Sequence, residues 1–298
     1  MRHLACDWVD AFTDRPFGGN ACAVVHDAAA LPLEDRLALV RETSLSECAF
    51  LVGSERADFG ARYYLTDREI PMAGHPTIAT VASLIHRGLV DMSTGAARFT
   101  LEVGAGVLPI EVVRRDGADI ITMTQAAPVF GPTFDPAEIA AIYGLAAGDV
   151  IGRPQIVSTG TPFCITLLRG QDALRRAVLD IDALHAFRAV SGEGRADLME
   201  PFLVTREGAT PAGDTFSRLL MAPPSPAEDP FTGSATGCMA AYLWHHGLIE
   251  GPEFTAEQGH HMGRPGQARV AVLGPRDAIT GIRVGGQGRV LMSGDLLL

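Results

Sequence analysis

Apolar residues fall into short runs along most of this chain, and glycine, proline and charged residues separate the runs. Short apolar or alternating runs bounded by turn residues are typical of β-strands, whereas a helical period of apolar residues indicates a helix. Helices are predicted at Leu33–Thr43 and Ile181–Val190 and from about Ser234 to His246. Strands are predicted at Leu4–Phe12, Ala21–Val25, Cys48–Val52, Arg62–Leu65, in two pieces around Thr100–Val113, and at Asp119–Thr124, Gln155–Ser158, Phe163–Leu168, Phe202–Thr205, Ser217–Ala222, Arg269–Leu273, Ile282–Val284 and Val290–Met292.

An internal repeat organises this pattern. Displacing the sequence by 228 − 69 = 159 residues aligns residues 69–91 with residues 228–250 without a gap, and nine of the 23 positions are identical. The shared residues include Gly74 with Gly233 and Gly88 with Gly247. So many identities favour two domains of one architecture related by duplication. Two unrelated buried helices with glycine ends are the alternative.

Each repeat predicts a helix enclosed on all sides. Residues 71–86 and 230–249 contain no Asp, Glu, Lys or Arg, so neither helix has a charged face for water. Gly88 and Gly247 follow these helices, where a left-handed residue ends a helix. In a chain of short strands, we expect an α+β fold in which a curved, mostly antiparallel sheet surrounds a central helix, twice. The expected domains are residues 1–124, completed by a C-terminal strand at 286–298, and residues 125–285.

Composition and charge narrow the possible functions. The 24 Lys and Arg against 35 Asp and Glu leave a net charge of −11, which disfavours nucleic-acid binding. The longest segment without a charged side chain, 230–249, is too polar for a membrane span, and the N-terminus reads as a strand rather than a signal peptide. Neither a membrane partner nor export is expected. The five scattered cysteines are expected to be buried and reduced, which fits the cytoplasm.

Candidate chemistry gathers at the starts of the two repeated helices. The first N–H groups of a helix are unpaired and its dipole favours anions, so Gly74-His75 and Gly233-Ser234 predict a binding site for a small carboxylate. His75 and Asp229 would add acid and base groups. Simpler roles stay open: His75 as a cap or core group, Asp229 as a backbone cap and Ser234 as a helix N-cap. Glu47, before an apolar strand, reads from its position alone as a solvated residue.

The sequence shows no clear motif for binding a metal ion or a phosphate group. The nine histidines show no ligand spacing beyond the adjacent pairs at 245–246 and 260–261, and Gly104-x-Gly106 is too short for a phosphate loop. These motifs therefore predict neither a metal site nor a phosphate-binding loop.

Several motifs together resemble the PhzF-like family, named for the phenazine-biosynthesis isomerase, within the diaminopimelate epimerase fold. The resemblance covers nearly the whole chain, and Gly74-His75-Pro76-Thr77 and the E-D-P-x-T-G-S-A element at 228–235 are specific together. The other matching segments are Asp10–Thr13, Pro16–Asn20, Leu45–Glu47, Glu69 with Ala73, Ser158–Gly160 with Pro162-Phe163, Glu257–Gly259, Gly263–Pro265 and Val284–Gly286. Residues 223–227, Pro-Pro-Ser-Pro-Ala, depart from the common pattern and are expected to reshape the rim of the cleft.

The resemblance implies a cofactor-independent isomerase that moves a proton between carbons of a small carboxylate. Glu47 corresponds to the family's general acid/base, and His75 and Asp229 to residues that assist it. The residues that match the family's substrate-binding positions are Ser46, Gly74, Gly233 and Ser234. A homodimer is expected from the same resemblance.

Three other functions are open at this point. A cysteine-type racemase or epimerase of the same fold would need two facing thiols, but the repeat places Ala79 opposite Cys238. A duplicated binding protein could have kept the cleft and lost catalysis. A serine hydrolase built on Ser234 lacks the strand–turn nucleophile elbow that such enzymes use.

Overall fold

The computed structural model describes residues 2–190 and 200–298. Its helices are α1 Leu33–Thr43, α2 Gly74–His86, α3 Pro136–Ile142, α4 Gln171–Arg176, α5 Ile181–Ala189 and α6 Gly233–His245. Its strands are β1 His3–Ala11, β2 Asn20–Val25, β3 Cys48–Val52, β4 Phe59–Tyr64, β5 Glu69–Ile70, β6 Ala96–Val103, β7 Gly106–Arg115, β8 Ala118–Gln125, β9 Val129–Thr133, β10 Gln155–Ser158, β11 Pro162–Leu167, β12 Phe202–Thr205, β13 Thr215–Leu220, β14 Glu228–Asp229, β15 Glu253–Gln258, β16 Gly266–Leu273, β17 Gly281–Gly286 and β18 Gly288–Leu297.

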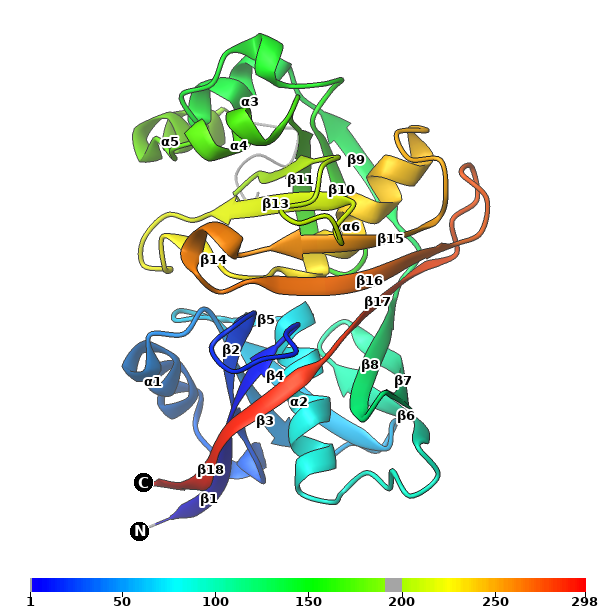
Figure 1. Ribbon diagram of the computed structural model, residues 1–298. Helices are drawn as coiled ribbons and strands as arrows, with labels where there is room; N and C mark the ends of the chain where they lie inside the picture. Colours follow the sequence, from blue (N-terminus) through cyan, green and yellow to red (C-terminus); the bar gives the residue numbers. More distant parts are fainter. Residues whose placement is uncertain (1, 191–199) are drawn as a thin grey trace.

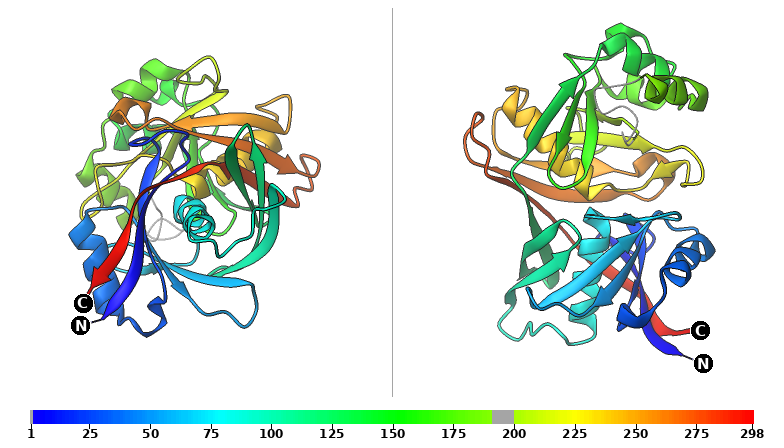
Figure 2. Two further views of the ribbon diagram at one scale, coloured as in Figure 1. Left: turned by 60° about the horizontal axis from the view of Figure 1, so that its bottom comes forward. Right: turned by 180° about the vertical axis from the view of Figure 1, so that it is seen from behind.

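The chain forms two lobes, one above the other, and each lobe wraps strands around one helix (Figure 1). In the lower lobe α2 packs against β1, β2, β3, β8 and β18; in the upper lobe α6 packs against β10, β11, β16 and β17. Helix α1 covers the outside of the lower sheet, and α3, α4 and α5 cover the outside of the upper sheet (Figure 2). This arrangement confirms the predicted α+β class.

Two segments of the chain cross between the lobes. One runs from β8 into β9, and the other from β17 into β18. Strand β17 pairs antiparallel with β16 in the upper lobe and with β8, while β18 returns to pair antiparallel with β1, His3 opposite Leu297. The C-terminal strand therefore completes the sheet around α2.

The two central helices are buried as their uncharged sequences predict. Every residue of α2 from Gly74 to Leu84, and every residue of α6 from Gly233 to Leu243, is buried. Gly88 and Gly247 follow the helix ends with φ of 69° and 67°, the left-handed conformation expected there. One continuous apolar core contains residues of both helices, so the sheets and the two helices pack as a single unit.

Some local features differ from the sequence prediction. The helical spacing of the apolar residues in α1 predicts that Arg36 faces water, but Arg36 is buried. Its guanidinium donates to the Tyr64 hydroxyl and to the backbone oxygens of Ala28 and Leu31. Helix α3 was missed because it is short, although the Asp135 side chain accepts from the N–H of Ala137 and Pro136 occupies its first turn, both typical start signals. Helix α4, also missed, has six residues.

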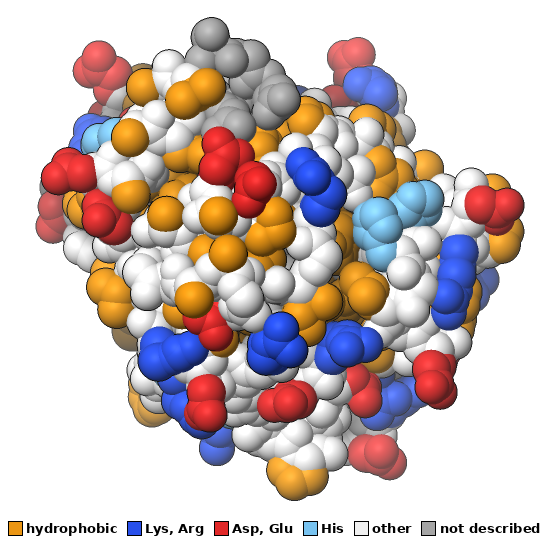
Figure 3. Space-filling model, turned by 90° about the horizontal axis from the view of Figure 1, so that it is seen from above, with side chains coloured by type: hydrophobic (Ala, Val, Ile, Leu, Met, Phe, Trp, Pro, Cys, Tyr) orange, Lys and Arg blue, Asp and Glu red, His pale blue; other side chains and the backbone are white. Residues whose placement is uncertain are grey.

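The described part of the chain has charged side chains of both signs on its surface. Within residues 2–190 and 200–298, no helix is both long and apolar enough to cross a membrane. Figure 3 shows basic and acidic side chains interspersed over the top of the upper lobe, with no basic stripe on that face.

All five cysteines are free; four are buried as expected, but Cys6 is only partly buried.

Candidate active site

The N-terminal ends of α2 and α6 meet between the lobes. The backbone of Gly74 lies so close to Gly233 that a Cβ built on Gly74 would stand 2.5 Å from the Gly233 Cα. Beside this contact the rings of Phe12 and Phe231 stack with centroids 4.3 Å apart. The unpaired N–H groups and positive dipole ends of both helices are therefore brought to one place.

Glu47 enters this region from the lower lobe. It lies in the connection between α1, which ends at a left-handed Ser44, and β3, whose parallel pairing with β2 fixes the start of the strand. Glu47 Oε2 lies 3.0 Å from His75 Nδ1. The Glu47 side chain is 18% exposed and the His75 side chain 2% exposed, so the pair is largely shielded from solvent.

Asn20, the first residue of β2, connects the lobes at the same point. Its Nδ2 lies 2.7 Å from Asp229 Oδ1, 3.0 Å from the Phe231 carbonyl oxygen and 3.0 Å from His75 Nδ1. An amide nitrogen has two hydrogens, and the carboxylate and the carbonyl can only accept. These two oxygens therefore take the hydrogens, and His75 Nδ1 is left to share a proton with Glu47.

Asp229 is held from the upper lobe. It ends the two-residue strand β14, four residues before the start of α6, and is buried. The Thr232 hydroxyl donates to Asp229 Oδ2 at 2.6 Å, and Gln258 Nε2 donates to the Asp229 backbone oxygen at 2.8 Å. Both carboxylate oxygens therefore have a donor.

The ionisation of the three groups follows from burial and charge. Burial, and then the charge of Asp229, raise the pKa of Glu47 well above its usual range. Burial also raises the pKa of Asp229, although hydrogen bonds from Thr232 and Asn20 act in the opposite direction. Burial lowers the pKa of His75 to about 3. At neutral pH the imidazole is therefore neutral, and Glu47 is the carboxyl group that retains a proton most strongly.

A cavity of about 500 Å³ opens onto Glu47 and Asp229. The other predicted site residues on its wall are Ser46 and Ser234, and apolar side chains such as Met72 and Phe163 form part of the remainder. Ser46 Oγ and His75 Nε2 are buried and have no hydrogen-bond partner among the residues that the structure describes. The cavity can therefore hold a small molecule whose polar groups meet the helix ends and whose apolar part meets the side walls.

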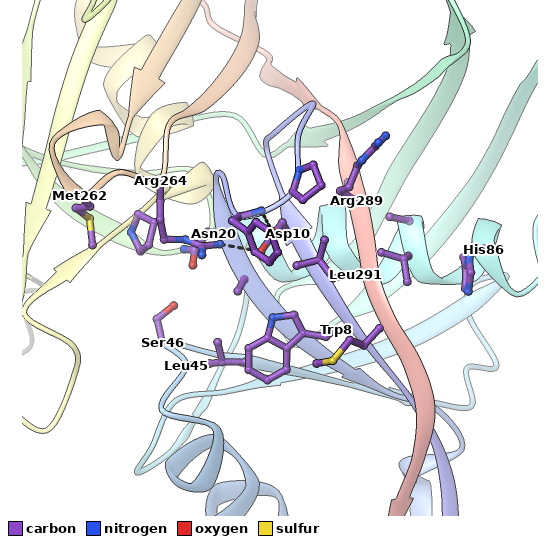
Figure 4. A pocket seen from close by; sticks show the side chains of 18 of the residues that line it. Trp8, Asp10, Asn20, Leu45, Ser46, His86, Met262, Arg264, Arg289 and Leu291 are labelled. Atoms are coloured by element: carbon purple, nitrogen blue, oxygen red, sulfur yellow. Dashed lines mark hydrogen bonds and ion pairs between the residues drawn. The ribbon is translucent and has the colours of Figure 1, made fainter.

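A second, larger groove of about 1090 Å³ lies on the other side of Asn20 and Ser46. Figure 4 shows Arg264 reaching toward Asp10 there, with Trp8, Leu45 and Leu291 nearby. Arg264 Nη2 donates to Asp10 Oδ1 at 2.7 Å, and its guanidinium also donates to the backbone oxygens of Gly18 and Gly19. This contact between the lobes holds the loop that precedes Asn20.

The structure brings together Ser46, Glu47, Gly74, His75, Asp229, Gly233 and Ser234, all the site residues predicted from the sequence. Ser234 as helix N-cap is wrong, because Thr232 occupies that position and Ser234 is the second residue of α6. Sequence reasoning gave no role to Asn20, Thr232 or Gln258, although all three lie within matching segments. Among the described residues, no group of three His, Cys, Asp or Glu side chains is arranged to hold a metal ion.

Two sheet-wrapped helices that meet end to end beside Glu47, His75 and Asp229 define an α+β protein with one enclosed site at the helix ends. A model of the PhzC-PhzF family, described as phenazine biosynthesis-like protein, matches residues 9–294. The chain belongs to this family, and the enzymes it is similar to are isomerases.

The relatives agree with this assignment. "Uncharacterized isomerase YfhB" of Bacillus subtilis is 31% identical over 265 residues, 88% of each chain. Trans-2,3-dihydro-3-hydroxyanthranilate isomerase of Pseudomonas aeruginosa is 28% identical over 96% of each chain. The crystal structure of a PhzF-family phenazine biosynthesis protein of Bacillus anthracis superposes with a TM-score of 0.84 and 27% identity over the full length of both chains. A hydroxyproline epimerase of Agrobacterium vitis, at 17% identity and a TM-score of 0.68, shares the fold.

Proposed function

We propose that this protein is a cofactor-independent isomerase that moves a proton between two carbons of a small carboxylate, with Glu47 as the general acid/base. The contact that carries the proposal is the 3.0 Å separation of His75 Nδ1 from Oε2 of Glu47, which lines the cavity. A carboxyl group with a raised pKa takes a proton from an acidic C–H more readily than an ordinary carboxylate does. The protonated carboxyl group then returns this proton to a different carbon of the substrate.

The surrounding groups have complementary parts in this proposal. The N–H groups at the starts of α2 and α6, with the hydroxyls of Ser46 and Ser234, bind the substrate carboxylate and the negative charge that develops when the proton leaves. His75 stays neutral and supports the proton on Glu47 through Nδ1. Asp229 orients the cluster, and its negative charge strengthens the proton affinity of Glu47.

Proton exchange with solvent tests the proposal. The Pseudomonas aeruginosa relative is named for trans-2,3-dihydro-3-hydroxyanthranilate, so this carboxylate and simpler unsaturated ring carboxylates are the first candidates. In deuterium oxide the wild-type protein is expected to place deuterium on a substrate carbon, and the Glu47→Gln variant to bind the same compound without exchange. Asp67→Asn, at an exposed carboxyl on the rim of the cavity, is the matched control and should exchange normally.

Two outcomes would contradict the proposal. Unchanged exchange in the Glu47→Gln variant would remove Glu47 as the acid/base. Binding of these carboxylates without exchange by the wild-type protein would favour a binding protein that has lost catalysis. The homodimer stays a prediction, which sedimentation equilibrium of the full chain tests.

A further inference from the structure

The amide of Gln258 has one possible orientation. Gln258 is fully buried at the end of β15; its Oε1 accepts from the Thr232 N–H at 2.9 Å, and its Nε2 donates to the Asp229 carbonyl oxygen at 2.8 Å. A backbone N–H can only donate and a backbone carbonyl can only accept. Exchanging the nitrogen and oxygen of this side chain would break both bonds, so the assignment is fixed by the backbone.

This orientation sets the direction of the next hydrogen bond. Gln258 Nε2 also donates to Thr232 Oγ1 at 3.1 Å, so the Thr232 hydroxyl is an acceptor on that side. Its own hydrogen therefore points to its other partner, Asp229 Oδ2, at 2.6 Å. Asn20 supplies the hydrogen on Asp229 Oδ1, since the orientation of its amide is fixed in the same way by the Phe231 carbonyl.

We propose that Thr232, oriented by Gln258, is a positioning residue that keeps Asp229 a carboxylate and thereby leaves the mobile proton of the site between Glu47 and His75. A donor on each oxygen stabilises the ionised form of Asp229, and protonation would weaken these hydrogen bonds. The inference extends the proposed function, because it matters for catalysis only if Glu47 is the group that carries the proton.

The charged neighbours support this distribution of protons. The charge of Asp229 acts on Glu47, which lies beside the neutral His75, and Glu228 precedes Asp229 in β14. Glu228 is paired with the Arg218 guanidinium, with hydrogen bonds of 2.9 and 2.7 Å, so its charge is largely compensated. Asp229 and Glu47 are then the two carboxyls that compete for one proton, and the hydroxyl of Thr232 favours the arrangement with that proton on Glu47.

Carboxyl titration by carbon-13 NMR tests the inference without substrate. Protein labelled at the side-chain carboxyl carbons of Asp and Glu is titrated, and the two signals are assigned from the Glu47→Gln and Asp229→Asn spectra. Thr232→Val removes the hydroxyl at similar volume. Its Asp229 signal is expected to titrate about one pH unit higher than in the wild type, and its Glu47 signal lower.

Two variants separate this effect from simple damage to the helix. Thr236→Val changes a buried threonine one turn further along α6, whose hydroxyl donates to the Thr232 carbonyl and not to Asp229, and should leave both titrations in place. Thr232→Ser should restore them. With substrate, Thr232→Val should lower kcat with little change in KM.

The inference is overturned if a folded Thr232→Val protein shows both signals at their wild-type positions, or if Thr236→Val shifts them equally. These readouts do not depend on activity. If the wild-type protein exchanges no proton into any carboxylate while the titrations behave as expected, the proposed function fails and the assignment of protons stands.

Discussion

The backbones of Gly74 and Gly233 touch across the boundary between the two lobes. A Cβ on Gly74 would stand 2.5 Å from the Gly233 Cα, and a Cβ on Gly233 would stand 3.0 Å from the Gly74 Cα and 2.8 Å from the Phe12 ring. Neither residue therefore has room for a side chain. Because each glycine is the first residue of its central helix, the contact fixes both helix ends and the groups beside them in one site.

A Gly74→Ala substitution is expected to separate these helix ends. The added methyl has no flexible neighbour to displace, since its nearest contacts are backbone atoms of Gly233 and Ser234. We expect a loss of about 1–3 kcal/mol in the free energy of unfolding, as for other overpacked sites, and at least a tenfold loss of proton exchange. Denaturant unfolding and deuterium incorporation measure the two effects.

Gly53→Ala is the control for this prediction. A Cβ at Gly53 meets nothing within 4 Å, so the variant should fold and exchange as the wild type does. Full exchange by Gly74→Ala would show that the close approach of the two helices is not needed for the site.

These same glycines show how far the sequence alone leads. The uncharged repeats around Gly74 and Gly233 were enough to predict two enclosed helices, because a helix without a charged face must be buried wherever it lies. The sequence did not predict the buried position of Glu47. A carboxylate before an apolar strand is usually solvated, and only the packing of β3 against α2 shows that Glu47, which precedes β3, points inward to His75. Its role came from the family resemblance.

The hydrogen-bond partners of Asp229 could not be predicted from the sequence either. Asn20 and Gln258 lie 209 residues before and 29 residues after Asp229, and no local pattern relates residues so far apart. The same is true of Arg36, where helical period predicted an exposed side chain. Periodicity reports which face of an element is apolar, but a buried polar contact depends on what a different segment brings opposite to it.

Asp7 is expected to stabilise the lower lobe in a defined pH range. This fully buried carboxylate accepts hydrogen bonds from Ser83, Arg87 and Ser293, and so joins β1, α2 and β18. Burial opposes its ionisation, but the hydrogen bonds from Arg87, Ser293 and Ser83 prevail and hold the pKa of Asp7 at about 2, below the usual 3.8.

The sign of the pH effect follows from this lowered pKa. The contribution is present above pH 3.8 and is lost as the pH falls toward 2, because the unfolded chain takes up the proton first; it amounts to about 2 kcal/mol. Asp7→Asn should therefore destabilise the protein near neutral pH and flatten the dependence of stability on pH between these values. Asp172→Asn, at a side chain 90% exposed, should do neither. Equal acid sensitivity of the Asp7→Asn variant and the wild type would contradict the assignment.

Cys238 is expected to be dispensable for proton transfer. It lies inside α6, fully buried, with Sγ 3.5 Å from the Thr159 hydroxyl oxygen, and burial raises its pKa to about 11. A thiol in that state is not a base at neutral pH. Cys238→Ala should therefore lower stability by about 1 kcal/mol and keep exchange within about twofold of the wild type. A loss of a hundredfold or more in a folded variant would favour the cysteine-type mechanism instead.

The pH dependence of exchange should report the raised pKa of Glu47. Glu47 must be ionised to accept a proton from carbon, so kcat/KM should rise with pH to a plateau. The midpoint of this rise should lie well above 4.5, the ordinary pKa of a glutamate. The charge of Asp229 is the second cause of the raised pKa, after burial. In Asp229→Asn the residual exchange should therefore show a midpoint that is lower than in the wild type but still above 4.5.

An exposed carboxyl provides the comparison for this effect. Asp67→Asn removes a negative charge at the rim of the cavity, where water screens it, and should leave the midpoint unchanged. A wild-type midpoint near 4.5 would mean that Glu47 is hydrated during turnover. A midpoint that rises in Asp229→Asn would mean that Asp229 does not act on Glu47 through its negative charge.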